Sequence, residues 1–438
     1  MENHIDNGSG PLHMIRVLLE RTNSVSRSTY FWNALNATLS AAQQAMILIV
    51  MNRTNGIRDA GIFSIAYAVA SLMLFVGQYG LRRYQASDIE EEMSFSEYLG
   101  MRFVTCGAMI IASLVYCGWC MAFGNYTMTK FIVVFLVCLE KVIQAFADVL
   151  HGRMQQAGRL DVAAKASASR IVLSTLMFMI ALLITHQLIV STVVWVLANL
   201  LIYLLTSQNV LRNYAEFRPS FRFEAIKRLT IIGLPLFLSY FLSMYIGNAP
   251  KYAIDRYLTD DVQAYYNFIF MPAFAVQLLA NFIFNPILTS YAHVWAEKRF
   301  KKFRKLIIRQ MIVVLGITIL GLGVAATIGI PILSVIFGVD LSSLKTELCI
   351  VMIGGGFLGY VTFFTTIITI IRHQNLLLLG YCTAAGAAMV LSKYFVLNYE
   401  MVGAAGLYAV LMGLLAFVFL VIMIVKIRKA EKEYKGKI

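Results

Sequence analysis

The sequence predicts an all-α integral membrane protein with twelve transmembrane helices in two six-helix halves. Three observations predict this fold. First, 59% of the 438 residues are hydrophobic and 14% are charged, with a mean hydropathy of +0.73, whereas soluble globular chains carry roughly a quarter charged residues. Second, apolar segments of about twenty residues, long enough to cross a bilayer core as helices, recur along the chain. Third, a weak internal repeat pairs the first segment with the seventh.

The apolar segments set the predicted order of the helices along the chain. The apolar run in the basic N-terminal tail is too short for the h-region of a cleaved signal peptide, so we expect this tail to stay on the mature protein. The twelve predicted spans are 28–51, 60–81, 98–123, 129–151, 161–185, 190–210, 231–256, 262–290, 306–329, 344–371, 376–397 and 403–426.

The distribution of lysine and arginine predicts the orientation of these spans. With the N-terminus inside, 29 of the 37 basic residues lie at the inner ends and connections, and seven lie at the outer ones. Basic residues concentrate on the cytoplasmic side of membrane proteins. We therefore expect both termini to be cytoplasmic. The same bias accounts for most of the net charge of +14, so the charge does not call for a nucleic-acid partner.

The internal repeat appears when the sequence is shifted by 203 positions. Arg53 then aligns with Arg256, and Asn52 aligns with Asp255. The shift also aligns three apolar or small pairs, which are Gly61 with Ala264, Phe63 with Tyr266, and Ala70 with Ala273. Because each half holds six spans, an even number, the two halves share one orientation and are related by an axis along the membrane normal.

The repeat also predicts the domain organisation. Residues 1–210 form the N-terminal lobe, with a cytoplasmic tail at 1–27. The C-terminal lobe is residues 231–438 with a tail at 427–438, and the basic segment 211–230 is the cytoplasmic linker between the lobes.

The stretch GNAPKYAIDR, at the outer end of the seventh span, is the first candidate site. Helical spacing puts Asn248, Lys251 and Asp255 on one face, and Arg256 lies on a neighbouring face. One interpretation is that these residues mark the water interface, with Lys251 paired to Asp255. The other is that they line a water-filled cavity, because ionisable groups at membrane depth usually face an interior. Arg53, which the repeat pairs with Arg256, and Arg58 belong to the same candidate set.

The fourth predicted span holds the second candidate site. Glu140 and Lys141 lie near its centre, where an unpaired charge costs about 2.5–3.5 kcal/mol on insertion scales. Asp148 lies at i+7 from Lys141 on the same helical face. One interpretation is a structural salt bridge between the two halves. The alternative is that Lys141 contacts a substrate, while Glu140 and Asp148 are the first candidates for coupling to a proton or sodium ion.

Three long stretches of the sequence resemble a known family. These are FSIAYAVASLMLFVGQYGLRRYQASD, FADVLHGRMQQAGRLDVAAKASASR and NAPKYAIDRYLTDDVQAYYNFIFMPAFAVQLLANFIFNPILT. In order and spacing they are similar to the Wzx-type polysaccharide-repeat flippases of the multidrug/oligosaccharidyl-lipid/polysaccharide (MOP) exporter superfamily.

The resemblance implies a V-shaped arrangement of the two lobes around a central cavity that opens alternately to the two sides of a bacterial cytoplasmic (inner) membrane. The implied cargo is an undecaprenyl-diphosphate-linked oligosaccharide, such as an O-antigen or capsule unit, and it moves from the inner to the outer leaflet. Such a cargo is anionic, so the candidate cations Arg53, Arg58, Lys141, Lys251 and Arg256 suit it through charge-assisted hydrogen bonds. Membrane lipids and other polysaccharide-assembly proteins are further expected partners.

Other functions are weighed against the flippase. A multidrug exporter of the same superfamily is expected to have an apolar or acidic pocket for organic cations, and the basic candidates disfavour it. A membrane polymerase or glycosyltransferase requires catalytic groups gathered outside the membrane, whereas the longest loops here are basic and cytoplasmic. We therefore expect no enzyme activity, cofactor or metal. A membrane scaffold for polysaccharide assembly stays open.

Overall fold

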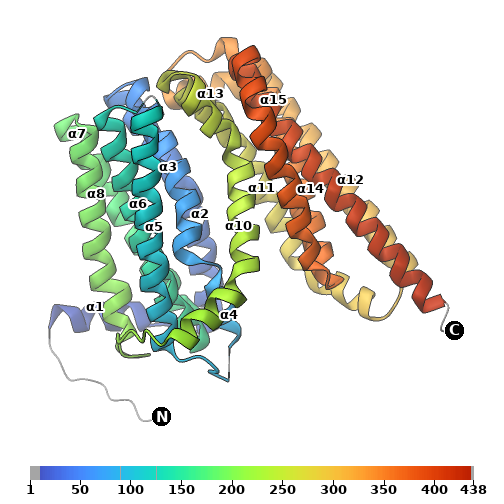
Figure 1. The fold of residues 1–438 in the computed structure, drawn as a ribbon, viewed down its shortest axis with the longest axis horizontal. Helices are drawn as coiled ribbons and strands as arrows, with labels where there is room; N and C mark the ends of the chain where they lie inside the picture. Colours follow the sequence, from blue (N-terminus) through green and yellow to red (C-terminus); the bar gives the residue numbers. More distant parts are fainter. Residues whose placement is uncertain (1–9, 89, 125, 436–438) are drawn as a thin grey trace. The chain divides into compact units, whose positions relative to one another are not determined.

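The computed structural model describes residues 10–88, 90–124 and 126–435, without the side chains of residues 274–289. All regular secondary structure in this described part is helical (Figure 1), which confirms the all-α prediction. The helices of the first half of the chain are α1 (Pro11–Glu20), α2 (Val25–Thr54), α3 (Ile57–Gln78), α4 (Leu81–Ser87), α5 (Phe95–Phe123), α6 (Met128–Gln156), α7 (Leu160–Thr185), α8 (Leu188–Tyr203), η1 (Leu204–Gln208) and α9 (Asn209–Leu211). Those of the second half are α10 (Phe223–Tyr257), α11 (Asp260–Ala296), α12 (Phe300–Val324), η2 (Ala325–Gly329), α13 (Ile330–Phe337), η3 (Ser342–Leu344), α14 (Lys345–Ile370), η4 (Gln374–Leu376) and α15 (Leu377–Lys435).

The long helices have the length and composition of membrane spans. Nine helical segments of the described residues are long and apolar enough to cross a bilayer. The last of them contains two predicted spans, 376–397 and 403–426, which meet at Glu400, where the backbone is not helical (φ 46°, ψ −124°). Helix α6 is not among the nine, because Lys130, Glu140, Lys141 and Asp148 interrupt its apolar sequence. The chain is therefore a multi-pass membrane protein.

The chain divides into two compact units, Met1–Tyr240 and Phe241–Ile438. The boundary falls inside α10, so this helix contributes residues to both units. The predicted tails extend to residues 1–9 and 436–438, which lie outside the described residues. The assignment of 1–210 and 231–438 to two lobes stays a prediction.

The segment that was expected to link the lobes, 211–230, packs on the first unit. The backbone N–H of Ser220 donates a hydrogen bond to the carbonyl of Ser96, at the start of α5 (2.8 Å). Gly100 makes this close approach possible, since a Cβ atom there would lie 1.9 Å from the Ser220 carbonyl oxygen. Two ion pairs, Arg222 with Glu97 and Arg228 with Glu92, hold the rest of the segment. The segment is a fixed part of the first unit and not a free tether.

Helix ends agree with the internal repeat. Helices α2 and α10 end at Thr54 and Tyr257, and α3 and α11 begin at Ile57 and Asp260, in both cases 203 positions apart. Burial agrees as well: Asn52 and Asp255 are both buried, and Arg53 and Arg256 are both exposed. The three apolar or small pairs, Gly61 with Ala264, Phe63 with Tyr266, and Ala70 with Ala273, are buried in both copies. The repeat is therefore structural and covers one helical hairpin in each half of the chain.

Candidate functional site

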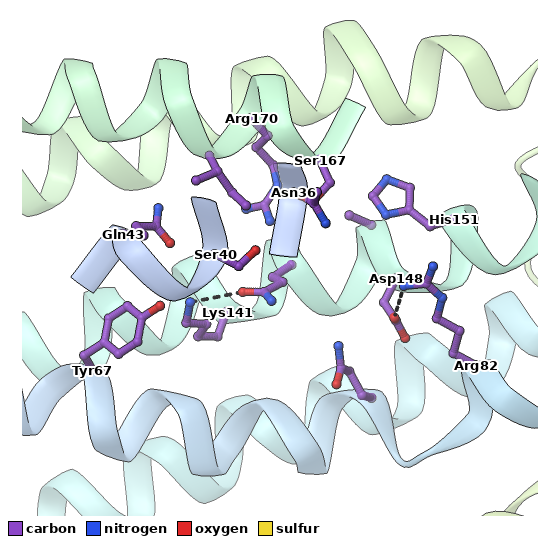
Figure 2. Close-up of a pocket in the computed structure, with 14 residues that line it drawn as sticks. Asn36, Ser40, Gln43, Tyr67, Arg82, Lys141, Asp148, His151, Ser167 and Arg170 are labelled. Carbon is purple, nitrogen blue, oxygen red and sulfur yellow. Dashed lines mark hydrogen bonds and ion pairs between the residues drawn. The ribbon is translucent and has the colours of Figure 1, made fainter. Parts of the chain in front are cut away.

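A polar pocket lies inside the first unit, among α2, α3, α4, α6 and α7. Its volume is about 140 Å³. Figure 2 shows Lys141 and Tyr67 toward one end of the pocket, and Arg82, Asp148 and His151 toward the other. The full lining is Asn36, Ser40, Gln43, Tyr67, Gln78, Arg82, Lys141, Gln144, Ala147, Asp148, His151, Ser167, Arg170 and Ile171.

Helix α6 supplies one polar face to this pocket. Lys141, Gln144, Asp148 and His151 follow one another at intervals of three or four residues, which places them on one side of a helix. The sequence predicted the face from Lys141 to Asp148 but not its continuation to His151. The same spacing was the signal for His151, whose Nε2 lies 3.0 Å from the hydroxyl of Ser207.

Glu140 is held by two cations beside the pocket. Nζ of Lys141 lies 3.0 Å from Oε2 of Glu140, and Nη1 of Arg170 lies 3.0 Å from Oε1. Nη1 of Arg170 also donates to Oδ1 of Asn199 at 2.7 Å. All these side chains are buried and belong to α6, α7 and α8 of the first unit. The predicted structural salt bridge of Glu140 and Lys141 is therefore present, and the partners of Glu140 belong to the first unit.

Lys141 itself reaches the pocket. Its Nζ donates to Oε1 of Gln144 at 3.0 Å and lies 4.5 Å from the ring centre of Tyr67. A cation over an aromatic face is attracted by the negative electrostatic potential of the ring. Lys141 is thus fixed by a carboxylate, an amide and a ring, with its charge at the edge of a polar space.

Asp148 also has two cationic partners. Oδ2 accepts from Nη2 of Arg102 at 3.0 Å, and Oδ1 accepts from Nη1 of Arg82 at 3.3 Å. Arg102 on α5 is fully buried, and it also donates to the carbonyl of Gly77, at the end of α3. Arg82 on α4 is partly exposed. Asp148 therefore joins α4 and α5 to α6.

Cations outnumber carboxylates at this site. Arg82, Lys141 and Arg170 line the pocket together with the carboxylate of Asp148. Two residues outside the lining pair with residues in it: Arg102 with Asp148, and Glu140 with Lys141. They add one positive and one negative charge. A partly open pocket with an excess of positive charge is suited to an anion, because opposite charges attract more strongly beside a protein surface than in bulk water.

Sequence reasoning missed Arg170 and Arg102. Both had been counted among the basic residues that orient the spans. Arg170 lies well inside a predicted span, 161–185, where a charge is costly unless it is paired. Its depth was therefore the available signal, while its partners on α6 and α8 come from tertiary packing.

The other predicted site residues are not in this pocket. Arg53 and Arg58 are exposed residues of the first unit. In the second unit, Asn248, Lys251 and Asp255 are buried, while Arg256 is exposed. Lys251 is only 2% exposed and its Nζ lies 4.6 Å from the ring centre of Phe270. Such burial disfavours the interpretation of Lys251 as an anchor at the water interface.

Comparisons with known proteins identify the fold. Neither the scan against protein-family models nor the search of curated proteins gave a match. Among solved structures, the chain is similar to an inward-facing multidrug resistance MATE family transporter of the MOP superfamily, with a TM-score of 0.61 and 12% identity over 97% of this chain and 99% of that one.

Two further structures give the same result. A MOP superfamily transporter from Pyrococcus furiosus, described as having a binding pocket of reverse polarity, has a TM-score of 0.55 and 12% identity over 94% of this chain and 98% of that one. A eukaryotic MATE transporter has a TM-score of 0.57 and 12% identity over 93% of this chain and 98% of that one. The chain therefore has the fold of the MATE transporters of the MOP superfamily.

Proposed function

We propose that this chain is a MOP superfamily flippase of the Wzx type, which moves an undecaprenyl-diphosphate-linked oligosaccharide from the inner to the outer leaflet of a bacterial cytoplasmic membrane. Alternating access of a cavity between the two lobes is the proposed mechanism. The observation that carries this proposal is the excess of cations over carboxylates in the pocket of the first unit.

The charge of the pocket supports an anionic ligand group. Phosphate oxygens accept charge-assisted hydrogen bonds from guanidinium and ammonium groups, which offset their lost hydration. The volume of the pocket is about 140 Å³. The pocket therefore suits one small anionic group of the cargo and not a whole oligosaccharide. We assign this contact to Lys141, whose Nζ lies at the pocket edge.

The second candidate set extends the proposal to the other unit. Lys251 with Asn248 and Asp255 forms a buried polar face in α10. We propose that this face meets the cargo in another step of the transport cycle. The exposed guanidinium groups of Arg53, Arg58 and Arg256, which lie on the predicted outer side, attract the diphosphate as it leaves toward the outer leaflet.

Glu140 and Asp148 are proposed as the groups that couple transport to a proton or sodium ion. Asp148 is the better placed of the two, because it lines the pocket and one of its partners, Arg82, is partly exposed. An anionic ligand that attracts Arg82 releases one oxygen of Asp148 for a coupling ion.

A multidrug exporter is the second candidate, and the fold favours it as much, because the neighbours include multidrug MATE transporters. The two functions differ in the charge of their cargo. An organic cation entering the pocket meets Arg82, Lys141 and Arg170, and like charges repel each other. The chemistry of the pocket therefore favours the flippase.

The test is transport in proteoliposomes that contain only this protein, with lipid-linked oligosaccharide and ethidium as alternative cargoes. Lys141→Gln should lower flipping about tenfold or more, since a hydrogen bond to a charged group contributes about 1.5–3 kcal/mol. Lys130→Gln is the matched control, because Lys130 is a buried lysine of the same helix outside the pocket.

The outcomes separate the functions. Flipping that is lost in Lys141→Gln and kept in Lys130→Gln supports the proposal. Ethidium transport without flipping identifies a multidrug exporter. Transport of neither cargo by folded protein indicates a scaffold and contradicts both transporter proposals.

A further inference from the structure

Helix α1 lies across the ends of other helices in the first unit and is not a span itself. It contacts α7, η1 and α9, and Figure 1 draws it crosswise at the foot of α8. Leu19 on its inner face is buried with Met154 and Val210, and Ile15 packs against the same cluster. One side of α1 is therefore part of the core of this unit.

Two cations at the start of α7, Arg159 and Lys165, fix the end of α1. Nζ of Lys165 donates to the carbonyls of Leu19 and Arg21, both at 2.9 Å, and Nη2 of Arg159 donates to the carbonyl of Glu20 at 2.7 Å. The last carbonyls of a helix have no partners inside the helix and carry partial negative charge. Lys165 and Arg159 supply these carbonyls with hydrogen-bond donors and with positive charge, so this end of α1 is bonded to the start of α7.

A second set of bonds ties the helix to α9 and the residues after it. Nδ2 of Asn209 donates to the carbonyl of Leu12 at 2.7 Å, and Nη1 of Arg16 donates to Oδ1 of Asn213 at 3.1 Å. Nδ2 of Asn213 donates to Oε1 of Glu20 at 2.9 Å. With both ends tied, α1 has a fixed height relative to the spans of its unit.

The outer face of α1 is apolar and exposed. Met14, Val17 and Leu18 lie at i, i+3 and i+4, which places them on one face. Their exposed fractions are 71%, 49% and 70%. The polar residues Arg16 and Glu20 lie on another side and bond to the protein. Helix α1 is therefore apolar on the side that packs on the core and also on this exposed face.

The spans show what meets this face. Leu201, near the end of α8, and Leu204, at the start of η1, are exposed apolar residues on a membrane span. Leu204 lies five residues before Asn209, whose side chain bonds to α1. Leu204 and Asn209 are therefore about 8 Å or less apart along the helix axis. Lipid-facing surface therefore reaches almost to α1.

We propose that the face formed by Met14, Val17 and Leu18 rests in the boundary between lipid headgroups and acyl chains, as an in-plane amphipathic helix. Such helices bury their apolar face about 5–10 Å into that boundary, which agrees with the distance between α1 and the lipid-facing leucines. The partner is the bilayer itself. This proposal does not depend on the cargo of the transporter.

Spin labelling in vesicles tests the proposal. Single cysteines replace Met14 and Leu18 on the apolar face, and Glu20 on the polar side, in a full chain whose six native cysteines are replaced. The purified protein is reconstituted in phosphatidylethanolamine and phosphatidylglycerol vesicles. Labels at 14 and 18 should collide more often with oxygen, which dissolves in lipid, than with a water-soluble nickel chelate. The label at 20 should show the reverse order.

Two results overturn the proposal. Greater exposure to the nickel chelate than to oxygen at 14 and 18 places the face in water. Low exposure to both reagents places it against protein, which in a pure sample is a second copy of this chain. A melting temperature equal to that of the cysteine-free parent shows that each labelled chain is folded, and Val17→Cys serves as a second reporter of the same face.

Discussion

Nη1 of Arg170 lies 3.0 Å from Oε1 of Glu140, while Nζ of Lys141 lies 3.0 Å from Oε2 of the same carboxylate. One buried carboxylate is therefore shared by two cations from two helices. In an isolated pair of Glu140 and Lys141, either single substitution would leave one charge uncompensated. With Arg170 present, the three positions are no longer equivalent.

The first prediction follows from this asymmetry. Glu140→Gln leaves two buried cations without their carboxylate and should destabilise the protein by about 3–5 kcal/mol, the usual cost of breaking a buried ion pair. Lys141→Met should cost much less, because Glu140 keeps Arg170. Thermal melting of the detergent-purified variants measures both.

Glu216→Gln is the control for the same chemical change at the surface. Glu216 pairs with Arg218 in the exposed part of the linker segment, and exposed pairs contribute about 0–1 kcal/mol. Equal melting temperatures for Glu140→Gln and Glu216→Gln would contradict the shared-carboxylate description. A loss in Lys141→Met as large as in Glu140→Gln would show that Lys141 and not Arg170 is the main partner.

The second prediction concerns the docking of the linker segment. Gly100→Ala places a Cβ atom 1.9 Å from the Ser220 carbonyl oxygen, so the linker must move. Overpacking of this kind costs about 1–3 kcal/mol. Limited proteolysis should cut residues 212–222 faster in this variant, and its melting temperature should fall.

Gly107→Ala is the matched control on the same helix. A Cβ atom at Gly107 meets nothing within 4 Å, and alanine is favoured over glycine inside helices by about 1 kcal/mol. Its melting temperature should stay equal or rise. Unchanged proteolysis in Gly100→Ala would mean that the linker does not depend on this contact.

The third prediction tests the polar face of α10 in the second unit. If Lys251 and Arg256 contact the diphosphate, neutralising either one should weaken binding by about 1.5–3 kcal/mol. Lys251→Arg should keep part of the transport because the charge survives. The measurement is translocation of lipid-linked oligosaccharide in proteoliposomes, normalised to folded protein by melting.

Lys393→Gln is the control, because Lys393 is an exposed lysine of the same unit. It should transport at the rate of the unaltered protein. Unaltered rates in both Lys251→Gln and Arg256→Gln would remove this face from the substrate path and leave Lys251 as a packing residue over Phe270.

The fourth prediction concerns orientation, which depends on the distribution of basic residues. A cysteine at Asn398 should react with an impermeant reagent added outside sealed cells, and cysteines at Ser94 and Ala215 should not. Asn125, a second expected outer position, lies outside the described residues. Reaction at Ser94 or Ala215 would reverse the topology.

Local patterns in the sequence were enough for the helices and for one face of the site. Hydropathy predicted the spans, and a shift of 203 positions predicted the repeat, whose first helices, α2 and α10, end at Thr54 and Tyr257. Intervals of three and four residues along α6 put Lys141 and Asp148 on one face before any packing was known. These features depend only on neighbours along the chain.

Contacts between residues far apart in the sequence could not be predicted from such local patterns. Arg170 reaches Glu140 across thirty positions, and Ser220 reaches Ser96 across more than a hundred. No periodicity links such residues, since packing of one helix against another decides the contact. The same holds for Gly100, which in the sequence is one small residue among many and in the structure is the surface on which the linker lies.

The equal spacing of the two helical hairpins has a consequence for the history of the chain. A hairpin copied once within a gene leaves two segments whose ends fall at one fixed interval, as α2–α3 and α10–α11 do. On that history Lys251 and Leu48, 203 positions apart and both buried, descend from one ancestral codon. One copy kept or gained a charge where the other has a hydrocarbon, so the two hairpins differ in chemistry at this position while the ends of their helices keep the same spacing.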